Sequence, residues 1–391
     1  MTVRSSLPGE RDHRLDTFRG IALMMIFINH VPGNIYEHLT SRNFGYSDAA
    51  EAFVLMSGIA VGLAYARGFA NGPLSSALLK VWKRAGKLYA TQMIITMWAI
   101  AVVAAGIVYF DTADVVKSVN FTPLLDRPLA SMIGIPLLTH QLGYFNILPL
   151  YFVLLLASPL YILIGLRSRL ALVLFAVAVW FMAGSFRLNF PNYPNEGGWF
   201  FNPLSWQLIY AIGIAAGMEA KEGRKLVPYD LGLFLICASY LVFSLVWVQF
   251  RLGAFPGSGQ LPFFIASYDK TFVALPRLLH VLALAYVLTN LDAVTRLLKT
   301  KPFQPLQLMG QHGLYVFAAG SLIAITLQVL RYRYEPNWFE DGALLASGIL
   351  VQYGLALFLD YLAPKKSAPV PAAAQKAKMQ EGAGRPAFLS R

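Results

Sequence analysis

Cysteine is almost absent from this chain of 391 residues, in which Cys237 is the only one. A single thiol excludes disulfides within the chain, thiolate metal clusters and dithiol redox chemistry. Charged residues are also scarce, at 13% against about 25% in an ordinary soluble domain. Hydrophobic residues make up 57% of the chain. Because so few charges cannot cover a water-facing exterior, much of the surface must contact lipid.

Several common catalytic motifs are missing as well. The sequence contains no HExxH, no Cys/His ligand cluster, no Walker loop and no GxGxxG, so it gives no support for a metal, ATP or dinucleotide site. It has no Gly-x-Ser-x-Gly elbow of a serine hydrolase. We find no internal repeat of the kind that marks many transporters.

Long apolar stretches are what the chain has in abundance. A membrane-spanning helix needs about 20 mostly apolar residues. Ten stretches qualify, at 14–33, 48–66, 86–109, 144–166, 169–186, 203–219, 230–250, 270–291, 308–330 and 342–362. The sequence therefore predicts an all-α, polytopic integral membrane protein with about ten transmembrane helices. Residues 1–363 would form the membrane domain, and the Pro/Ala/Lys-biased residues 364–391 a disordered cytoplasmic tail.

The positive charges lie mostly on one side of these stretches. Of the 32 Lys and Arg residues, 23 fall at the N-terminus, in alternate loops or in the tail. They are Arg4, Arg11, Arg14, Arg19, Arg67, Lys80, Lys83, Arg84, Lys87, Arg167, Arg169, Lys221, Arg224, Lys225, Arg296, Lys299, Lys301, Lys365, Lys366, Lys376, Lys378, Arg385 and Arg391. Positive charge concentrates in cytoplasmic loops, so both termini are expected in the cytoplasm. We therefore attribute the net charge of +12 to cytoplasmic loops that face anionic lipid headgroups, and not to a nucleic acid partner.

The first apolar stretch carries ionisable residues near both ends. Arg19 and His30 are eleven residues apart, which is about three helical turns, so they share a helix face with about 16 Å between them. Asn29 precedes His30. An ionisable group within a span is costly and is therefore a functional candidate. The alternative is that Arg19 reaches the lipid headgroups and His30 caps a helix at the far interface.

The second stretch contains two acids and a Gly-xxx-Gly pair. Asp48 and Glu51 are one turn apart, and Gly58 and Gly62 lie on the same face as Glu51. Such glycines let a second helix or a ligand approach the backbone. Acids also favour helix N-termini, which suits Asp48 better than the more deeply placed Glu51.

Two later stretches carry further polar candidates. Arg277 and His280 lie on adjacent turns of an apolar stretch, where a buried Arg needs an anion from the protein or from a ligand. An internal pair between Arg277 and Glu51 is one possibility, and a carboxylate on a bound acyl group is the other. His312, at the start of the ninth stretch, is by itself more typical of a packing residue.

One loop on the less basic side is rich in aromatic and amide residues. It includes Tyr193, Trp199, Asn202 and Trp206. Flat rings beside hydrogen-bonding groups suit the faces and hydroxyls of a sugar. An interfacial aromatic belt accounts for part of this composition, but it accounts poorly for the Asn- and Pro-rich segment at 191–195.

These segments carry a family resemblance. The run RLDTFRGIALMMIFINH resembles the first-helix signature of the acyltransferase-3 group of membrane acyltransferases, an Arg followed by ten residues and a His. EAFVLMSGI resembles the second-helix motif of that group, with Met56 as a departure from its usual form. Four blocks resemble the narrower glucans biosynthesis protein C family: SDAAEAFVLMSG, NILPLYFVLLLASPL at 146–160, FNPLSWQLIYAIG at 201–213 and HGLYVFAAG at 312–320.

The resemblance implies an inner-membrane enzyme of bacteria that places succinyl groups on osmoregulated periplasmic glucans. Succinyl-CoA from the cytoplasm would be the acyl donor, with coenzyme A as a co-substrate and no tightly bound cofactor or metal. His30 would be the general base, open toward the periplasm, or would itself form an acyl-histidine. The candidate catalytic residues are His30, Glu51 and Asp48. The candidate donor-binding residues are Arg19, Lys83, Arg84, Lys87 and His312, and the candidate acceptor-side residues are Arg277, His280, Asn29, Tyr193, Trp199, Asn202 and Trp206.

Two other functions fit parts of the same pattern. The enzyme could acetylate another surface polysaccharide, since the motifs specify the family better than the acyl group. A transporter of solutes or lipid-linked sugars could use the same His and acids as a proton relay. Transfer or hydrolysis of an acyl donor by the purified protein distinguishes an enzyme from a transporter.

Overall fold

The structure, a computed structural model, describes residues 13–112, 115–255, 257–331 and 337–363. Within these ranges the chain is helical, and the one β-bridge, between Pro191 and Gly198, belongs to no strand. The predicted all-α fold class is therefore confirmed. The predicted tail at 364–391 and the basic residues Arg4 and Arg11 lie outside the described residues.

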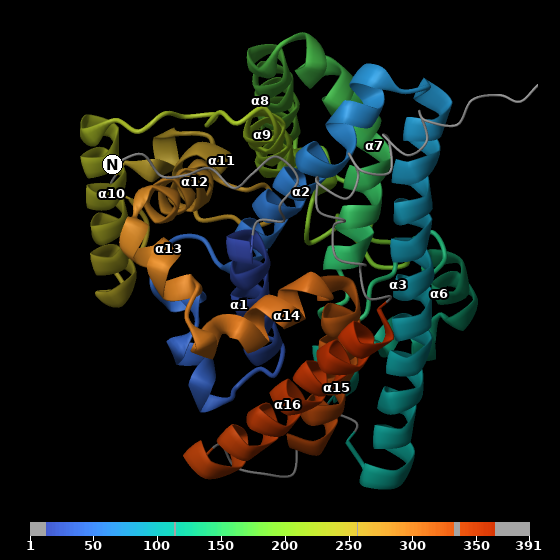
Figure 1. The fold of residues 1–391 in the computed structure, drawn as a ribbon. Helices are drawn as coiled ribbons and strands as arrows, with labels where there is room; N and C mark the ends of the chain where they lie inside the picture. The colour runs from blue at the N-terminus through green and yellow to red at the C-terminus, as the bar shows by residue number, and fades with distance from the viewer. Residues whose placement is uncertain (1–12, 113–114, 256, 332–336, 364–391) are drawn as a thin grey trace, which may run out of the picture.

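Ten of the described helices have 16 residues or more. They are α1 (His13–Asn29), α2 (Ala49–Asn71), α3 (Leu74–Phe110), α7 (Ile147–Arg167), α8 (Arg169–Ser185), α9 (Pro203–Lys221), α10 (Leu231–Gln249), α12 (Leu275–Asn290), α15 (Gly313–Arg331) and α16 (Trp338–Leu362). Figure 1 shows α3 along one side of the molecule and α10 along the other, with α1 between them.

Shorter helices connect the long ones. The α-helical connections are α4 (Val115–Ser118), α5 (Thr122–Asp126), α6 (Pro128–Gly134), α11 (Phe263–Ala266), α13 (Asp292–Leu298) and α14 (Gln304–Gln311). The 3-10 helices are η1 (Ile35–Leu39), η2 (Ser41–Asn43), η3 (Ser258–Gln260) and η4 (Lys301–Phe303).

Each of the ten predicted apolar stretches overlaps one of the ten long helices. By length and composition, six of the described helices can cross a membrane: α2, α3, α7, α10, α15 and α16. Helices α12 and α13, bent by 80° at their junction, make a seventh span if they cross together. These helices indicate a multi-pass membrane protein, while the count of ten spans stays a prediction.

Helix α3 is longer than the predicted span at 86–109, because it begins at Leu74 directly after Pro73. The prediction of a basic loop that carries Lys83, Arg84 and Lys87 is therefore wrong, since all three lie on this helix. Charged residues end an apolar stretch, but Lys and Arg are good helix formers. No proline interrupts the segment up to Phe110.

The Gly-xxx-Gly pair of α2 does bring a second helix close, and that helix is α9. A Cβ at Gly58 would lie 2.2 Å from the Tyr210 carbonyl oxygen, and one at Gly213 would lie 2.4 Å from the Leu55 carbonyl oxygen. Because only glycine tolerates such an approach, the two backbones are in direct contact. This packing places the N-terminal half of α2 at the centre of the fold.

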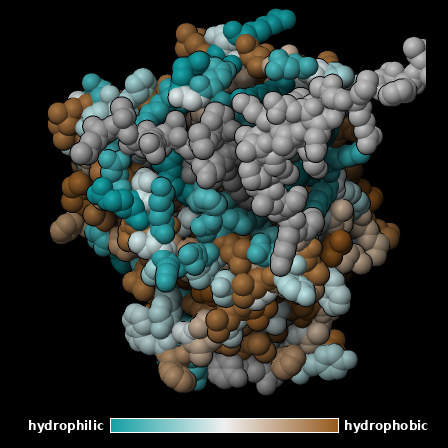
Figure 2. Space-filling model, viewed as in Figure 1, coloured by the Kyte–Doolittle hydropathy of each residue, from teal (hydrophilic) through white to brown (hydrophobic). Residues whose placement is uncertain are grey.

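Apolar side chains cover much of the exterior. On α10 the only buried residue is Ser244, and Leu235, Ile236 and Val242 are each more than half exposed. Figure 2 shows hydrophobic residues gathered over the lower part of one face, where α15 and α16 lie in Figure 1, and hydrophilic residues across its middle. In a multi-pass membrane protein such apolar surfaces face lipid.

Candidate active site

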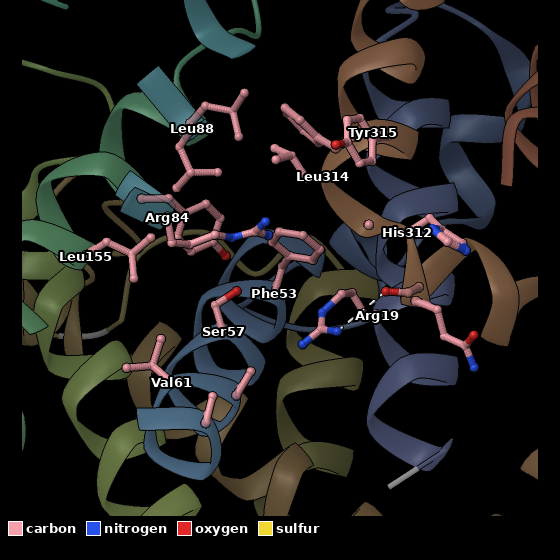
Figure 3. A pocket seen from close by; sticks show the side chains of 18 of the residues that line it. Arg19, Phe53, Ser57, Val61, Arg84, Leu88, Leu155, His312, Leu314 and Tyr315 are labelled. Carbon is pink, nitrogen blue, oxygen red and sulfur yellow. Dashed lines mark hydrogen bonds between the residues drawn. The ribbon is translucent and has the colours of Figure 1, made fainter. Parts of the chain in front are cut away.

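A cavity of about 360 Å³ lies where α1, α2, α3, α7, α9, α14 and α15 meet. We call it the Arg19 pocket. Its lining is Arg19, Phe53, Ser57, Ala60, Val61, Ala64, Tyr65, Arg84, Leu88, Leu148, Tyr151, Leu155, Tyr210, Gly310, Gln311, His312, Gly313, Leu314, Tyr315 and Phe317. Figure 3 shows Arg19 and Arg84, which come from different helices, pointing into the same cavity. The pocket therefore combines an apolar wall with cationic groups.

Arg19 is held in this pocket by contacts from two elements. Its Nη1 lies 3.3 Å from Oδ1 of the buried Asp16, one turn earlier on α1, and 3.5 Å from the Gly310 carbonyl oxygen of α14. Helix α14 can come this close because Gly20 has no side chain. A Cβ at this position would lie 1.8 Å from the Leu306 carbonyl oxygen. The guanidinium therefore has a defined position in the pocket wall.

Three of the other predicted donor-binding residues lie at or beside this pocket. Arg84 and His312 line it, and His312 Nε2 is 3.8 Å from Asp360 Oδ1. The Lys87 ammonium lies 4.7 Å above the ring of Tyr315, a lining residue. Lys83 is exposed on α3 and is not part of the lining.

His30 lies in the turn directly after α1. Its ring stacks on that of Tyr144, with centroids 4.6 Å apart and planes 12° from parallel. On another side it meets the edge of Phe317, with centroids 6.5 Å apart. Phe317 also lines the Arg19 pocket. One aromatic ring therefore contacts both the cationic pocket and the imidazole.

Four charged side chains form a compact cluster at the start of α2. Asp48 caps the helix, accepting a hydrogen bond from the Ala50 N–H, and Glu51 Oε2 accepts one from the Asp48 N–H at 3.0 Å. Lys270 Nζ lies 2.5 Å from Asp48 Oδ2, and Arg277 Nε donates to Glu51 Oε1 at 2.7 Å. We call Asp48, Glu51, Lys270 and Arg277 the charge cluster.

The charge cluster is matched internally, with two acids facing two cations. Arg277 pairs with Glu51 and lies 3.6 Å from Asp48 Oδ2. Glu51 is fully buried, and both of its carboxylate oxygens have partners. The structure therefore contains the internal pair that was one of the two alternatives for Arg277.

Two predicted acceptor-side residues have partners within the protein. His280 is buried, and its Nδ1 lies 2.7 Å from Ser47 Oγ. Asn29 Oδ1 accepts a hydrogen bond from Thr40 Oγ1 at 2.7 Å. Both contacts fix the segment that connects α1 and α2, which lies next to His30 and the charge cluster.

The aromatic loop divides into interior and surface residues. Trp199, Asn202 and Trp206 are buried. Asn202 caps α9, and Trp206 Nε1 donates to the Lys270 carbonyl at 3.0 Å. Tyr193 is 45% exposed. The first three side chains therefore hold the loop and the charge cluster in place, and Tyr193 alone among the four is open to a ligand at the surface.

Sequence reasoning missed Lys270 and Tyr144. Both fall at the margins of predicted apolar stretches, where a lone Lys or Tyr is typical of a membrane interface. Their importance depends on contacts with Asp48 and His30, which lie more than a hundred residues away in the chain. A short motif carries no signal for such contacts.

The comparisons with known proteins agree with the resemblance found in the sequence. The family described as OpgC protein matches residues 11–363, which is most of the chain. Searches of curated proteins and of solved structures found no match. The match covers all ten long helices, the Arg19 pocket, His30 and the charge cluster. The resemblance to the glucans biosynthesis protein C family is confirmed, and the chain belongs to the OpgC protein family.

Proposed function

We propose that this protein is a membrane-embedded O-acyltransferase that moves a succinyl group from cytoplasmic succinyl-CoA to glucose hydroxyls of periplasmic glucans. Membership of the family supports an acyltransferase-type enzyme of glucan modification. One observation carries the proposal further: Phe317 lines the cationic Arg19 pocket and also contacts the His30 ring. An anionic donor and a candidate base can therefore occupy neighbouring sites.

The orientation follows from the positive charges. The basic residues of the N-terminal half of α3, Lys83, Arg84 and Lys87, belong to the side that carries 23 of the 32 Lys and Arg. With ten spans and both termini in the cytoplasm, this side faces the cytoplasm. The Arg19 pocket then opens to the cytoplasmic pool of donor, and His30, at the other end of α1, lies toward the periplasm of the bacterial inner membrane.

The donor matches the pocket in charge and in shape. Coenzyme A carries its phosphates at one end and its thioester at the end of an extended arm. Arg19, Arg84 and Lys87 supply cations for the phosphates, since guanidinium groups bind phosphate through paired hydrogen bonds. Beyond them, Phe53 and Leu155 give the pocket an apolar wall. The arm would extend along this wall toward Phe317 and bring the thioester to His30.

The reaction at His30 is a direct acyl transfer. A ring nitrogen of His30 takes the proton of a glucose hydroxyl while the hydroxyl oxygen attacks the thioester carbonyl carbon. The carbon–sulfur bond then breaks, and the departing thiolate receives the proton from the imidazolium. Succinyl ester and free coenzyme A are the products. Tyr144, stacked on the ring, holds the plane of the imidazole.

The charge cluster and Tyr193 serve the acceptor side. Asp48 and Lys270 form an ion pair in the charge cluster, and we assign these polar groups to orienting the acceptor hydroxyl. Tyr193 supplies an exposed ring on which a sugar face can stack. Because Glu51 already holds Arg277 and the Asp48 N–H, we assign it to the support of this cluster.

The donor site is tested by Arg19→Ala. Loss of a charge-assisted contact to phosphate costs about 1.5–3 kcal/mol, so the affinity for coenzyme A is expected to fall about tenfold to a hundredfold. Calorimetry on the purified protein measures it. Arg67→Ala removes an exposed cation of α2 that is not in the pocket lining, and its affinity is expected to match the parent protein. Unchanged affinity in Arg19→Ala would make Arg19 a headgroup anchor.

A further inference from the structure

The turn that carries His30 is held by side chains from the C-terminal part of the chain. Gln328 of α15 donates its Nε2 hydrogen to the His30 carbonyl at 2.6 Å. Val31 is buried in a small apolar cluster with Leu327 and Leu345 of α15 and α16. In Figure 1 the segment after α1 runs toward the beginning of α16. The position of His30 therefore depends on elements about 300 residues later in the chain.

An ion pair between α15 and α16 holds the next residues. Arg331 Nε lies 2.8 Å from Asp341 Oδ1. The same guanidinium donates from Nη1 to the Pro32 carbonyl at 2.9 Å and from Nη2 to the Gly33 carbonyl. Asp341 Oδ2 accepts a hydrogen bond from the Ile35 N–H at 2.9 Å. This one ion pair therefore contacts the backbone of Pro32, Gly33 and Ile35.

The turn is shaped to accept this guanidinium. Gly33 has a φ of +78°, in the left-handed region that favours glycine. A Cβ at Gly33 would lie 2.9 Å from Arg331 Nη1, too close for an ordinary contact. Glycine at this position therefore permits both the backbone conformation and the approach of Arg331.

Burial and geometry make the contact directional. The side chains of Arg331 and Asp341 are only 12% and 3% exposed. A buried ion pair by itself adds little net stability, but the planar fork of Arg fixes the direction of each hydrogen bond that it donates. An arrangement of this kind defines where a backbone segment lies rather than adding stability alone.

We propose that Arg331 and Asp341 are positioning residues that place His30 for proton transfer. The inference rests on the proposed function, in which His30 is the base. A catalytic group must be held within about 0.5 Å of its productive position, and a displacement of about 1 Å can cost about a hundredfold in rate. Among the described residues that line the Arg19 pocket, neither Arg331 nor Asp341 occurs, so donor binding should not depend on them.

The test uses the full-length protein in lipid nanodiscs with succinyl-CoA and purified glucan. Arg331→Gln is expected to lower kcat at least about tenfold and to leave KM for succinyl-CoA within about twofold. Arg331→Lys keeps the charge opposite Asp341, but its ammonium group lacks the planar, forked donors that bind both carbonyls. Its kcat should therefore lie between those of the parent protein and Arg331→Gln. If Arg331→Gln does not fold, Arg331→Lys decides by the same split between kcat and KM.

Two comparisons separate positioning from a general loss of stability. Arg224→Gln removes an exposed guanidinium from its ion pair with Glu219 and should leave kcat unchanged. In a His30→Gln background, Arg331→Gln should cause no further loss of the residual rate, because both changes remove the same function. The proposal would be overturned if Arg331→Gln leaves kcat unchanged, or if its KM for succinyl-CoA rises as much as its kcat falls. It would also be overturned if the losses of the two single variants multiply in the double variant. A fully active His30→Gln protein would instead overturn the proposed base.

Discussion

Replacing His30 with glutamine is expected to slow succinyl transfer to glucan by at least about a hundredfold, the usual contribution of a general base. Glutamine keeps much of the size of the ring and can still contact Tyr144 and Phe317, the two aromatic partners of His30. Because the side chain does not line the Arg19 pocket, affinity for coenzyme A should stay near that of the parent protein. Mass spectrometry of the glucan product measures the rate.

His38→Gln is the matched control for this variant. His38 is exposed on η1, eight residues after His30, and the same substitution there should leave the transfer rate unchanged. A folded His30→Gln protein that transfers succinyl at the parent rate would end the general-base hypothesis. A folded protein that loses coenzyme A binding together with transfer would place His30 in the donor site instead.

Arg277→Gln is expected to destabilise the protein strongly, by about 3–5 kcal/mol, because it leaves a buried carboxylate without its cation. Glu51 has no exposed surface, and Arg277 is its ion-pair partner. Transfer from succinyl-CoA and from acetyl-CoA should therefore fail together, with a lower melting temperature in detergent. Thermal unfolding of the purified protein and parallel assays with both donors measure these effects.

The double variant Glu51→Gln with Arg277→Gln removes both charges of the pair and should recover a large part of the lost stability. Arg42→Gln breaks a more exposed pair with Glu37 and should change the melting temperature little. A stable Arg277→Gln protein that loses succinyl transfer but retains acetyl transfer would contradict this account. It would assign Arg277 to the carboxylate of the acyl group.

The sequence predicts the helices well because length and apolarity are local properties. Ten apolar stretches correspond to ten long helices, and the spacing of Gly58 and Gly62 predicts the close approach of a second helix. The error at α3 has the same origin. Hydropathy begins the apolar stretch only after Lys83 and Arg84, but the helix itself extends back to Leu74, directly after Pro73.

The site is less predictable, because its contacts join residues far apart in the chain. Arg19 and Arg84 reach one pocket from two helices, and only Arg19 belongs to a motif of the family. Composition cannot distinguish an exposed Tyr193 from a buried Trp206, since both occur in one aromatic loop. Arg331 belongs to no motif recognised in the sequence, and only the fold brings it to the turn after His30.

The most direct test of the account is transfer across a membrane. The purified protein is placed in liposomes with succinyl-CoA inside and glucan outside, and the outside glucan is analysed by mass spectrometry. The account predicts succinylated glucan with the parent protein and none above background with His30→Gln, because the donor pocket and the base lie toward opposite faces. Outside glucan that stays unmodified, although the protein in the vesicles binds coenzyme A, would contradict the account. Glucan recovered from inside the vesicles would also contradict it, because that result indicates transport of the glucan.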